Sequence, residues 1–354
     1  MGSRAVLKLQ GIQDRLKKLG VQRITDSHTH AFDKKDTRFK PRKGTMASTS
    51  YLHYPISRNL RVAQITFSAF QKGYRQVIFG LPSHNVDVKA QNNRVLSWAR
   101  KDPRLVPMAL VTPKMTKRDL ENLIYRGFTG LKPYPEFYSK FRKRIDVDLY
   151  LTEPMLKVAN QHKLPIILHS VPDASTHPSL EKIVNMAKSY PDAHFVLAHM
   201  GRGRDSKKTR ILCNAIKDLK NVSLSTSVTT DPSAFKIALQ VLGPRRIMFG
   251  SDFPWGLMEA ALKKLGKRHG SKKVPEELQG LQYLPKEKYK WALPEMVEMS
   301  SPKYRKNLDR MIVSNLEALV GTLEQLFANG KISEKDIRLI FSGNANRTFK
   351  RKLN

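Results

Sequence analysis

The histidines of this chain stand at spacings that could bind a metal ion. His28 and His30 lie at the end of a short apolar, β-branched run, with one residue between them. Because side chains alternate along a strand, both imidazoles are expected on one face, where they could reach a single ion. A lone His-x-His pair fits a structural or surface role equally well, so this pair does not decide the matter by itself.

Three further apolar runs end in residues that could bind the same ion, namely His169, His199 and Asp252. By alternation each is expected to face inward with alternate residues of its run, so that Phe195 and Leu197 share a face with His199. Imidazole nitrogens and a carboxylate suit Zn²⁺, with Mn²⁺ as an alternative, and leave a position open for water. Each could be a packed core residue on its own, but five at matching strand ends favour a metal site.

The chain alternates strand-like and helix-like segments eight times. The predicted strands are residues 23–28, 76–81, 105–111, 128–132, 165–169, 194–199, 222–226 and 246–252. The predicted helices between them are residues 59–72, 92–101, 117–126, 155–162, 179–190, 210–220 and 232–242. This predicts an α/β fold, the (β/α)₈ TIM barrel, over a doubly wound sheet, because no glycine-rich phosphate loop follows the first strand. The strand ends of a barrel converge at one mouth, which would bring the five candidate ligands together.

Additional segments are predicted at both ends of the chain and in two long loops. An amphipathic helix is expected over residues 6–19, and helices over 307–329, 332–341 and 344–350 close the chain. Residues 31–58 follow the first strand and residues 255–306 follow the eighth. We expect both to be lid-like insertions beside the mouth of the barrel. We expect one domain over residues 1–354.

Composition narrows the class of protein. Lys and Arg number 64 against 30 Asp and Glu, a net charge of +34, and the 40% hydrophobic content excludes a disordered chain. The single cysteine, Cys213, excludes a disulfide framework. No apolar run reaches the roughly 18 residues of a membrane span, and we expect a soluble, cytoplasmic protein. The basic residues are dispersed, which fits a solvated surface, so the charge alone assigns no partner. We expect a small, anionic substrate, and nucleic acid is a less favoured partner that the charge does not exclude. A homo-oligomer stays open.

Five short motifs carry a family resemblance. They are Asp26-Ser27-His28-Thr29-His30, Leu168-His169-Ser170, Ala198-His199-Met200-Gly201, Phe249-Gly250-Ser251-Asp252-Phe253-Pro254 and Gly343-Asn344-Ala345-Asn346-Arg347-Thr348-Phe349. They resemble the amidohydrolase superfamily of metal-dependent hydrolases, and more narrowly the amidohydrolase-related branch that contains aminocarboxymuconate-semialdehyde decarboxylase. The resemblance implies a divalent metal and four ligands, His28, His30, His169 and Asp252. It implies that His199 lies beside the bound water, as a ligand or as a catalytic residue.

Lys132 ends the fourth predicted strand and is expected to point inward. In binuclear members of the family a lysine here is carboxylated and bridges two metals. An unmodified Lys132 could instead bind an anionic group of the substrate, or reach solvent at the mouth. The weaker candidates for substrate contact are Arg202, His84, Tyr134 and Trp255, each of which could equally be solvated or packed.

The residues and the resemblance together predict a metal-dependent hydrolase that attacks an amide, ester or lactone carbonyl of a small, anionic substrate. The ion would lower the pKa of its water toward roughly 7, and Asp252 would accept the proton of that water. His199 would orient the nucleophile or polarise the carbonyl. A decarboxylase of the same family is the main alternative. A TatD-type metal-dependent nuclease is a weaker one, because Lys132 stands where a carboxylate would be needed. A binding protein without turnover is also open.

Overall fold

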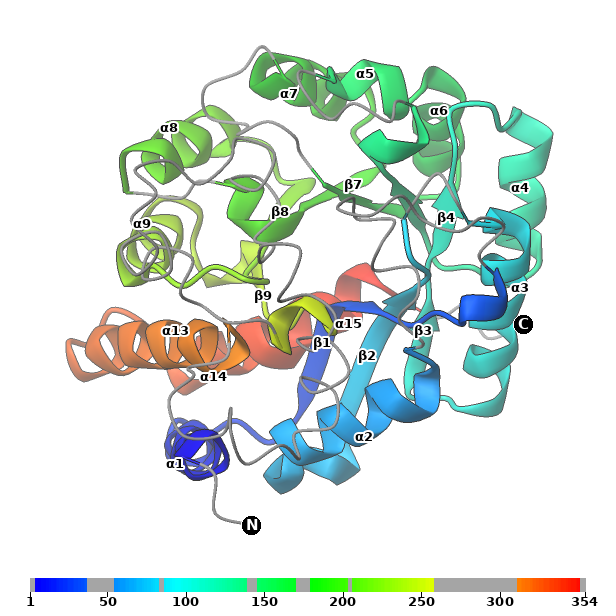
Figure 1. The fold of residues 1–354 in the computed structure, drawn as a ribbon. Coiled ribbons are helices and arrows are strands. Elements are labelled where there is room, and N and C mark those ends of the chain that lie inside the picture. Colours follow the sequence, from blue (N-terminus) through cyan, green and yellow to red (C-terminus); the bar gives the residue numbers. More distant parts are fainter. Residues whose placement is uncertain are drawn as a thin grey trace, which may run out of the picture.

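Parallel strands line the centre of the molecule and helices surround them (Figure 1). The structure, a computed structural model, describes residues 4–36, 54–82, 86–138, 145–169, 179–202, 206–257 and 311–350. Its strands are β1 (Ile24–His30), β2 (Tyr74–Phe79), β3 (Leu105–Pro107), β4 (Ala109–Val111), β5 (Leu131–Pro133), β6 (Pro165–Leu168), β7 (His194–Leu197), β8 (Val222–Ser225) and β9 (Ile247–Met248). The alternation of short apolar runs with amphipathic segments predicts this arrangement.

Helices follow most of the strands and form the outer ring. They are α2 (Ile56–Thr66), α3 (Val88–Lys101), α4 (Lys117–Tyr125), α5 (Val147–Tyr150), α6 (Glu153–Gln161), α7 (Ser179–Ser189), α8 (Ser206–Ile216) and α9 (Pro232–Leu242). Outside the repeat lie α1 (Arg4–Lys18), α13 (Met311–Ala328), α14 (Glu334–Arg338) and α15 (Asn344–Thr348). Most of the predicted helices are thus present with small shifts at their ends. The helix predicted at 59–72 ends at Thr66 and continues as a tighter turn over Ser68–Gly73, and the one predicted at 210–220 lies four residues earlier. The helix predicted at 332–341 is α-helical only over Glu334–Arg338 and continues as a wider π-helix over Leu339–Gly343.

Strand pairing is parallel throughout and runs in chain order, in two sheets, β1-β2-β3 and β4-β5-β6-β7-β8-β9. The predicted strand 105–111 is divided at Met108, because its first half pairs with β2 and its second half with β5. At the other seam the Ser27 N–H donates to the Phe249 carbonyl at 2.9 Å, and the Asp252 N–H to the His28 carbonyl at 2.8 Å. The strands therefore follow one another around a barrel, which confirms the predicted α/β fold, although the ladder is not continuous.

Side chains of alternate strand residues separate into two hydrophobic cores. The inner cluster fills the barrel and consists of Val77, Phe79, Val106, Met108, Leu110, Ile167, Val196, Ala198, Met248, Ala345 and Phe349. The intervening residues, such as Ile78 and Ile166, join the larger core between strands and helices. Each fully buried aliphatic side chain contributes roughly 1.5–3 kcal/mol to the hydrophobic free energy. Since Ala345 of α15 and Phe349 directly after it belong to the inner cluster, the C-terminal segment is part of the barrel core.

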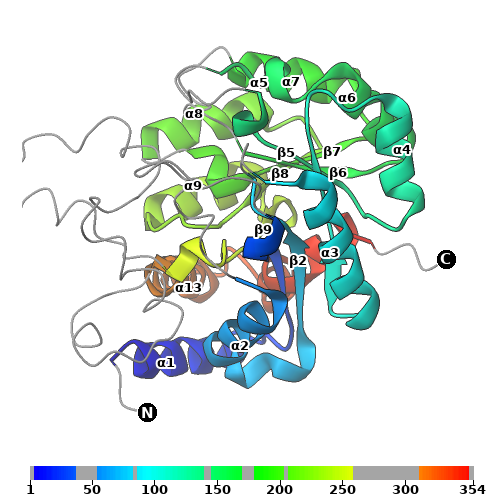
Figure 2. The same cartoon turned by 45° about the vertical axis from the view of Figure 1, so that its right-hand side comes forward.

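Helices α1 and α13 pack on each other beside the barrel (Figure 2). The buried side of α1 includes Leu9, Ile12 and Leu16, as the helical spacing of its apolar residues predicts. Arg15 binds both carboxylate oxygens of Glu324 on α13, at 2.8 and 2.6 Å. The pair fixes the orientation of α1 on α13.

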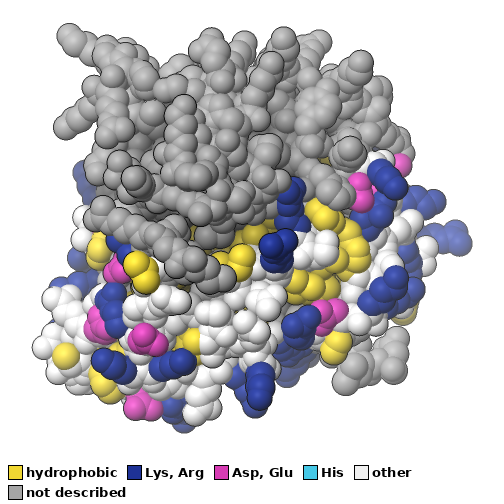
Figure 3. Space-filling model, turned by 60° about the horizontal axis from the view of Figure 1, so that its bottom comes forward, with side chains coloured by type: hydrophobic (Ala, Val, Ile, Leu, Met, Phe, Trp, Pro, Cys, Tyr) yellow, Lys and Arg dark blue, Asp and Glu magenta, His cyan; other side chains and the backbone are white. Residues whose placement is uncertain are grey.

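Several predictions concern residues that the structure does not describe. Residues 37–53 of the first predicted insertion and 258–310 of the second lie outside the described residues, as does His84. Lys and Arg side chains are spread over the face seen in Figure 3 among other side chains, in keeping with the dispersed basic residues of the sequence. None of the helices in the described ranges has the length and apolar character that crossing a membrane requires.

Candidate metal centre

His28 and His30 lie together at the end of β1, on the face that the alternation predicts. The Nε2 atom of His28 is 3.2 Å from Asp252 Oδ1, and that of His30 is 3.3 Å from the same oxygen. The Nδ1 atom of His30 lies 3.0 Å from the Gly80 carbonyl oxygen, a contact that directs Nε2 to the centre. All three side chains are buried.

Asp252 reaches the centre from the chain that follows β9. The strand ends at Met248, and Asp252 has a left-handed backbone with φ of 57°. Burial alone would raise the pKa of Asp252, but His199 and His28 outweigh that effect and hold the pKa well below its usual range. Asp252 is therefore a carboxylate at neutral pH, with Oδ1 facing the two histidines of β1 and Oδ2 4.0 Å from His199 Nδ1.

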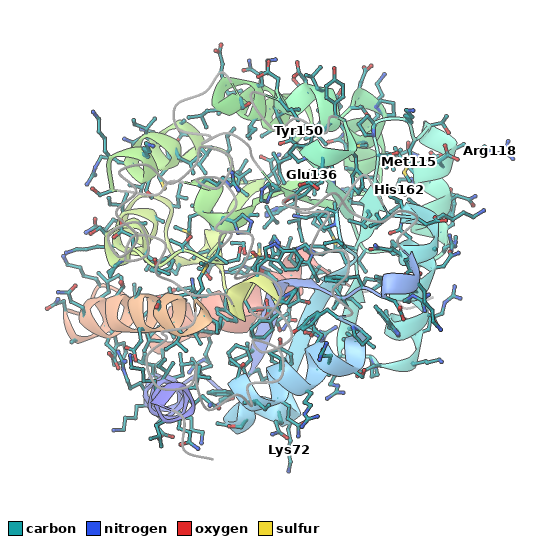
Figure 4. The ribbon with its side chains drawn as sticks, in the orientation of Figure 1. Lys72, Met115, Arg118, Glu136, Tyr150 and His162 are labelled. Atoms are coloured by element: carbon teal, nitrogen blue, oxygen red, sulfur yellow. The ribbon has the colours of Figure 1, made fainter. Side chains whose placement is uncertain are left out.

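His169 lies on the opposite side of the centre, just after β6. Its Nδ1 is 3.1 Å from His199 Nε2, and its Nε2 is 3.3 Å from the Tyr134 hydroxyl oxygen. The Tyr150 hydroxyl donates to the His169 carbonyl at 2.9 Å. Tyr150 and Glu136 lie inside the ring of helices, whereas Lys72 and Arg118 lie at its outer rim (Figure 4). Hydrogen bonds from Tyr134, just after β5, and from Tyr150 of α5 thus fix both the ring and the backbone of His169.

The prediction that Phe195 and Leu197 face inward with His199 is wrong. Val196 belongs to the cluster that fills the barrel, whereas Phe195 and Leu197 pack in the outer core. His199 nevertheless reaches the centre, because the chain turns at the end of β7 and residues 199–202 have φ between 52° and 62°. Such left-handed backbone costs roughly 1–2 kcal/mol for each residue that is not glycine. Burial lowers the pKa of His199 to about 4, so the ring is neutral at pH 7.

The spacing of these groups fits a divalent ion. One atom each of His28, His199 and Asp252 lie within 4.8 Å of one another. Bonds of 2.0–2.1 Å at tetrahedral angles place neighbouring ligand atoms about 3.3 Å apart. The contacts between the β1 histidines and Asp252 and the contact between His169 and His199 span 3.1–3.3 Å, close to that spacing. Nitrogen and oxygen donors of this kind suit Zn²⁺ or Mn²⁺.

Lys132 is buried beside the centre, with its side chain inside the barrel as predicted. Its Nζ lies 4.9 Å from the centroid of the Phe79 ring and 5.7 Å from that of Tyr134. It has no hydrogen-bond partner among the described residues. Burial lowers the pKa of Lys132 from 10.5 to about 7. Lys132 Nζ is therefore available to pair with an anionic group that enters the barrel. Lys132 does not reach solvent.

The remaining candidates for substrate contact are placed as follows. Trp255 stacks on the His30 ring at 4.9 Å between centroids and is partly exposed, so it forms one wall of the centre. Tyr134 is buried between His169 and Lys132. Arg202 ends the left-handed turn, close enough to His199 to contribute to its lowered pKa.

A comparison with protein-family models decides the class. The amidohydrolase model matches residues 25–290, three quarters of the chain, including all five candidate ligands. The chain belongs to the amidohydrolase family. The resemblance that the motifs indicate is thereby confirmed, and the protein is an enzyme of a metal-dependent family that acts on small molecules.

Solved structures share the fold of this amidohydrolase at low sequence identity. Amidohydrolase 2 from Bifidobacterium longum subsp. infantis is 13% identical, with 94% of this chain and 100% of that chain covered and a TM-score of 0.51. 4-Oxalomesaconate hydratase from Rhodopseudomonas palustris is 13% identical, with 93% and 96% covered and a TM-score of 0.51. 2,6-Dihydroxybenzoate decarboxylase from Rhizobium is 14% identical, with 93% and 99% covered and a TM-score of 0.51. No curated protein matches the chain.

Sequence reasoning missed two residues that organise the amidohydrolase centre. The buried Asp26 carboxylate accepts hydrogen bonds from the His28 N–H at 3.1 Å and the Ser251 N–H at 2.9 Å. It therefore joins the two segments that carry His28 and Asp252. Ser227, just after β8, contacts His199 through both its hydroxyl and its carbonyl. The position of Asp26 at the head of the first motif could have pointed to it, whereas an isolated serine gives no signal.

Proposed function

We propose that this amidohydrolase is a metal-dependent hydrolase of small, anionic amides, esters or lactones. One observation carries the proposal: three histidines and a carboxylate from three different parts of the chain meet within ligand-to-ligand distances at one end of the barrel. In barrel enzymes the chemistry takes place at the end where the strands finish.

The ion would be held by Asp252 together with the four histidines at the strand ends, His28, His30, His169 and His199. His199 could serve as a ligand or act on the substrate directly. When bound, a divalent ion supplies a Lewis acid for the carbonyl oxygen and makes a water more acidic. Zn²⁺ fits the donor set, and Mn²⁺ is the alternative.

Asp252 serves as the proton acceptor in this proposal. Its lowered pKa keeps it ionised at neutral pH, so its carboxylate oxygens are free to accept a proton. Oδ1 faces His28 and His30, which leaves Oδ2 to accept a proton from water and then to donate it to the leaving group. One carboxylate can therefore act as the base when the water attacks and as the acid when the leaving group departs.

His199 and Lys132 act on the substrate. A neutral His199 orients the nucleophile or donates a hydrogen bond to the carbonyl. Lys132 pairs with an anionic group of the substrate, because its Nζ is buried and lacks a partner among the described residues. Trp255 and Tyr134 would then form walls of the substrate site.

Decarboxylation is the second candidate, favoured by the fold that the protein shares with 2,6-dihydroxybenzoate decarboxylase. Non-oxidative loss of CO₂ needs a proton donor for the carbon that loses the carboxylate. Asp252 in its ionised state accepts a proton first, which suits hydrolysis better.

The proposal is tested with a panel of lactones, amides and esters, each with and without a carboxylate group. Purified protein is first analysed for bound metal per chain, and turnover is measured before and after treatment with a chelator. We expect chelation to abolish hydrolysis and added Zn²⁺ or Mn²⁺ to restore it. Turnover that persists without metal would reject the proposal, and release of CO₂ from an aromatic acid would favour the decarboxylase.

Asp252→Asn and Asp192→Asn provide a matched pair for the same assay. Asp192 is exposed and precedes β7, at the end of the barrel away from the metal centre. Loss of the proton acceptor should lower kcat by roughly 100-fold or more in Asp252→Asn. Asp192→Asn should retain full activity. Equal activity of the two variants would remove Asp252 from the proposed mechanism.

A further inference from the structure

The turn that carries His199 needs support from outside its own segment. Residues 199–202 all have left-handed backbone, and only Gly201 among them adopts it readily. A Cβ on Gly201 would lie 2.5 Å from the side chain of Leu212, so α8 packs tightly beneath the turn. This packing supports the backbone of the turn but does not hold the His199 ring.

Ser227 is the residue that contacts both the backbone and the ring of His199. The His199 N–H donates to the Ser227 hydroxyl oxygen at 3.3 Å, and the same oxygen lies 2.9 Å from His199 Nδ1. The Ser227 carbonyl oxygen lies 3.4 Å from Nδ1. With Nδ1 engaged in this way, Nε2 points to His169, 3.1 Å from its Nδ1.

The position of Ser227 is itself fixed by helix α13. The Asn315 side-chain amide donates to the carbonyls of Thr226 and Thr229, at 2.7 and 2.6 Å. These two hydrogen bonds hold the backbone in place on both sides of Ser227. Asn315 is buried, so water does not compete for the bonds.

We infer that Ser227 is a positioning residue that fixes the orientation and the protonated nitrogen of His199. A serine hydroxyl can both donate and accept, and the carbonyl can only accept. An Nδ1–H that donates to the carbonyl or the hydroxyl leaves Nε2 with a free lone pair on the side of the ring that faces His169. This is how a partner on the far nitrogen prepares a histidine to bind a metal or to accept a proton.

The inference rests on the proposed metal centre, and its test separates the two. Co²⁺ is loaded into wild type, Ser227→Ala and Ser223→Ala, and its dissociation constant and visible absorption spectrum are measured. Ser223 is the matched control, because it is a buried serine of β8 whose hydroxyl lies 2.9 Å from His194 Nε2, at the start of β7 and away from the metal centre. Ser227→Ala should weaken Co²⁺ binding by roughly 10–100-fold and change the spectrum. Ser223→Ala should match wild type in both.

A double-mutant cycle excludes a merely structural effect. In a His199→Ala background, Ser227→Ala should cause no further loss of Co²⁺ affinity, because its target is gone. An equal loss in both backgrounds, or a Ser227→Ala protein with wild-type affinity and spectrum, overturns the inference. If Ser227→Ala does not fold, Ser227→Cys takes its place in the cycle with the same expectations. A wild-type protein that binds no Co²⁺ would instead overturn the metal centre.

Discussion

Replacing Lys132 by methionine should stabilise the protein and impair its activity. The Lys132 amine is buried, and its pKa falls from 10.5 to about 7 because of that burial. At about 1.4 kcal/mol for each pKa unit, burial of this amine lowers the free energy of unfolding by about 4 kcal/mol at pH 7. Methionine has a similar length and no charge, so Lys132→Met should recover most of that amount.

The pH dependence of this effect has a definite sign. The unfolded state keeps its lysine protonated up to pH 10.5, whereas the native state loses the proton above about pH 7. Between these values the unfolded state binds more protons, so the stability of wild type rises with pH. The advantage of Lys132→Met should therefore shrink from about 4 kcal/mol at pH 7 to near zero close to pH 10.5.

Urea unfolding at pH 7, 8, 9 and 10 measures this difference, with Lys157→Met as a control on an exposed helix surface. The control should stay close to wild type at every pH. In activity assays Lys132→Met should raise the KM of a carboxylate-bearing substrate by roughly 10–100-fold. The KM of a neutral analogue should stay unchanged. A Lys132→Met protein that is less stable than wild type at pH 7 would refute the reasoning. It would mean that the native amine is paired or carboxylated.

Three further predictions concern stability. Arg15→Met should lower the free energy of unfolding by about 1 kcal/mol at low salt and by less in 1 M NaCl, because its pair with Glu324 is partly exposed. Burial lowers the pKa of His194 to about 4, so wild type should lose stability as pH falls from 6.5 to 4. Urea unfolding at pH 7 and 4.5 should show that His194→Asn removes about 3 kcal/mol of that loss. Asp26→Ala should lower the free energy of unfolding by about 2 kcal/mol, measured as a lower melting temperature. Asp26→Asn keeps an acceptor for the Ser251 N–H, so it should lower the free energy of unfolding by less than about 1 kcal/mol.

The sequence predicts the strand order and most of the centre because both depend on short-range periodicity. His28 and His30 share a face as alternation predicts, even though the pairing of β1 with β2 shifts register between Asp26 and Thr29, and Lys132 lies in the barrel as alternation also predicts. The sequence cannot show that the chain leaves β7 in a left-handed turn, because Met200 and Arg202 are not typical of that conformation. Alternation alone therefore places His199 at the centre while assigning the wrong residues to the inner face.

Residues that support the ligands are harder to predict than the ligands themselves. Ser227 acts through a hydroxyl and a carbonyl, and neither is distinctive in a sequence. Its own support comes from Asn315, which lies 86 residues beyond Thr229. Such contacts depend on how α13 packs on the barrel, and no local pattern encodes that packing.

Several energetically unfavourable features of this structure lie around the candidate centre, at the mouth of the barrel. The unpaired Lys132 amine, the unpartnered His28 Nδ1 and the left-handed backbone of His199 and Asp252 all occur among the described residues around the candidate centre. Selection for stability alone would remove these features. An apolar side chain in place of the unpaired polar groups, or a regular turn in place of the left-handed backbone, would make the folded state more stable. Unfavourable local features of this kind persist where a site must present a charged group or a free nitrogen atom to a ligand. We therefore expect substitutions at these residues that stabilise the protein to reduce its activity, whereas substitutions in the pair of Arg15 with Glu324 should change stability alone.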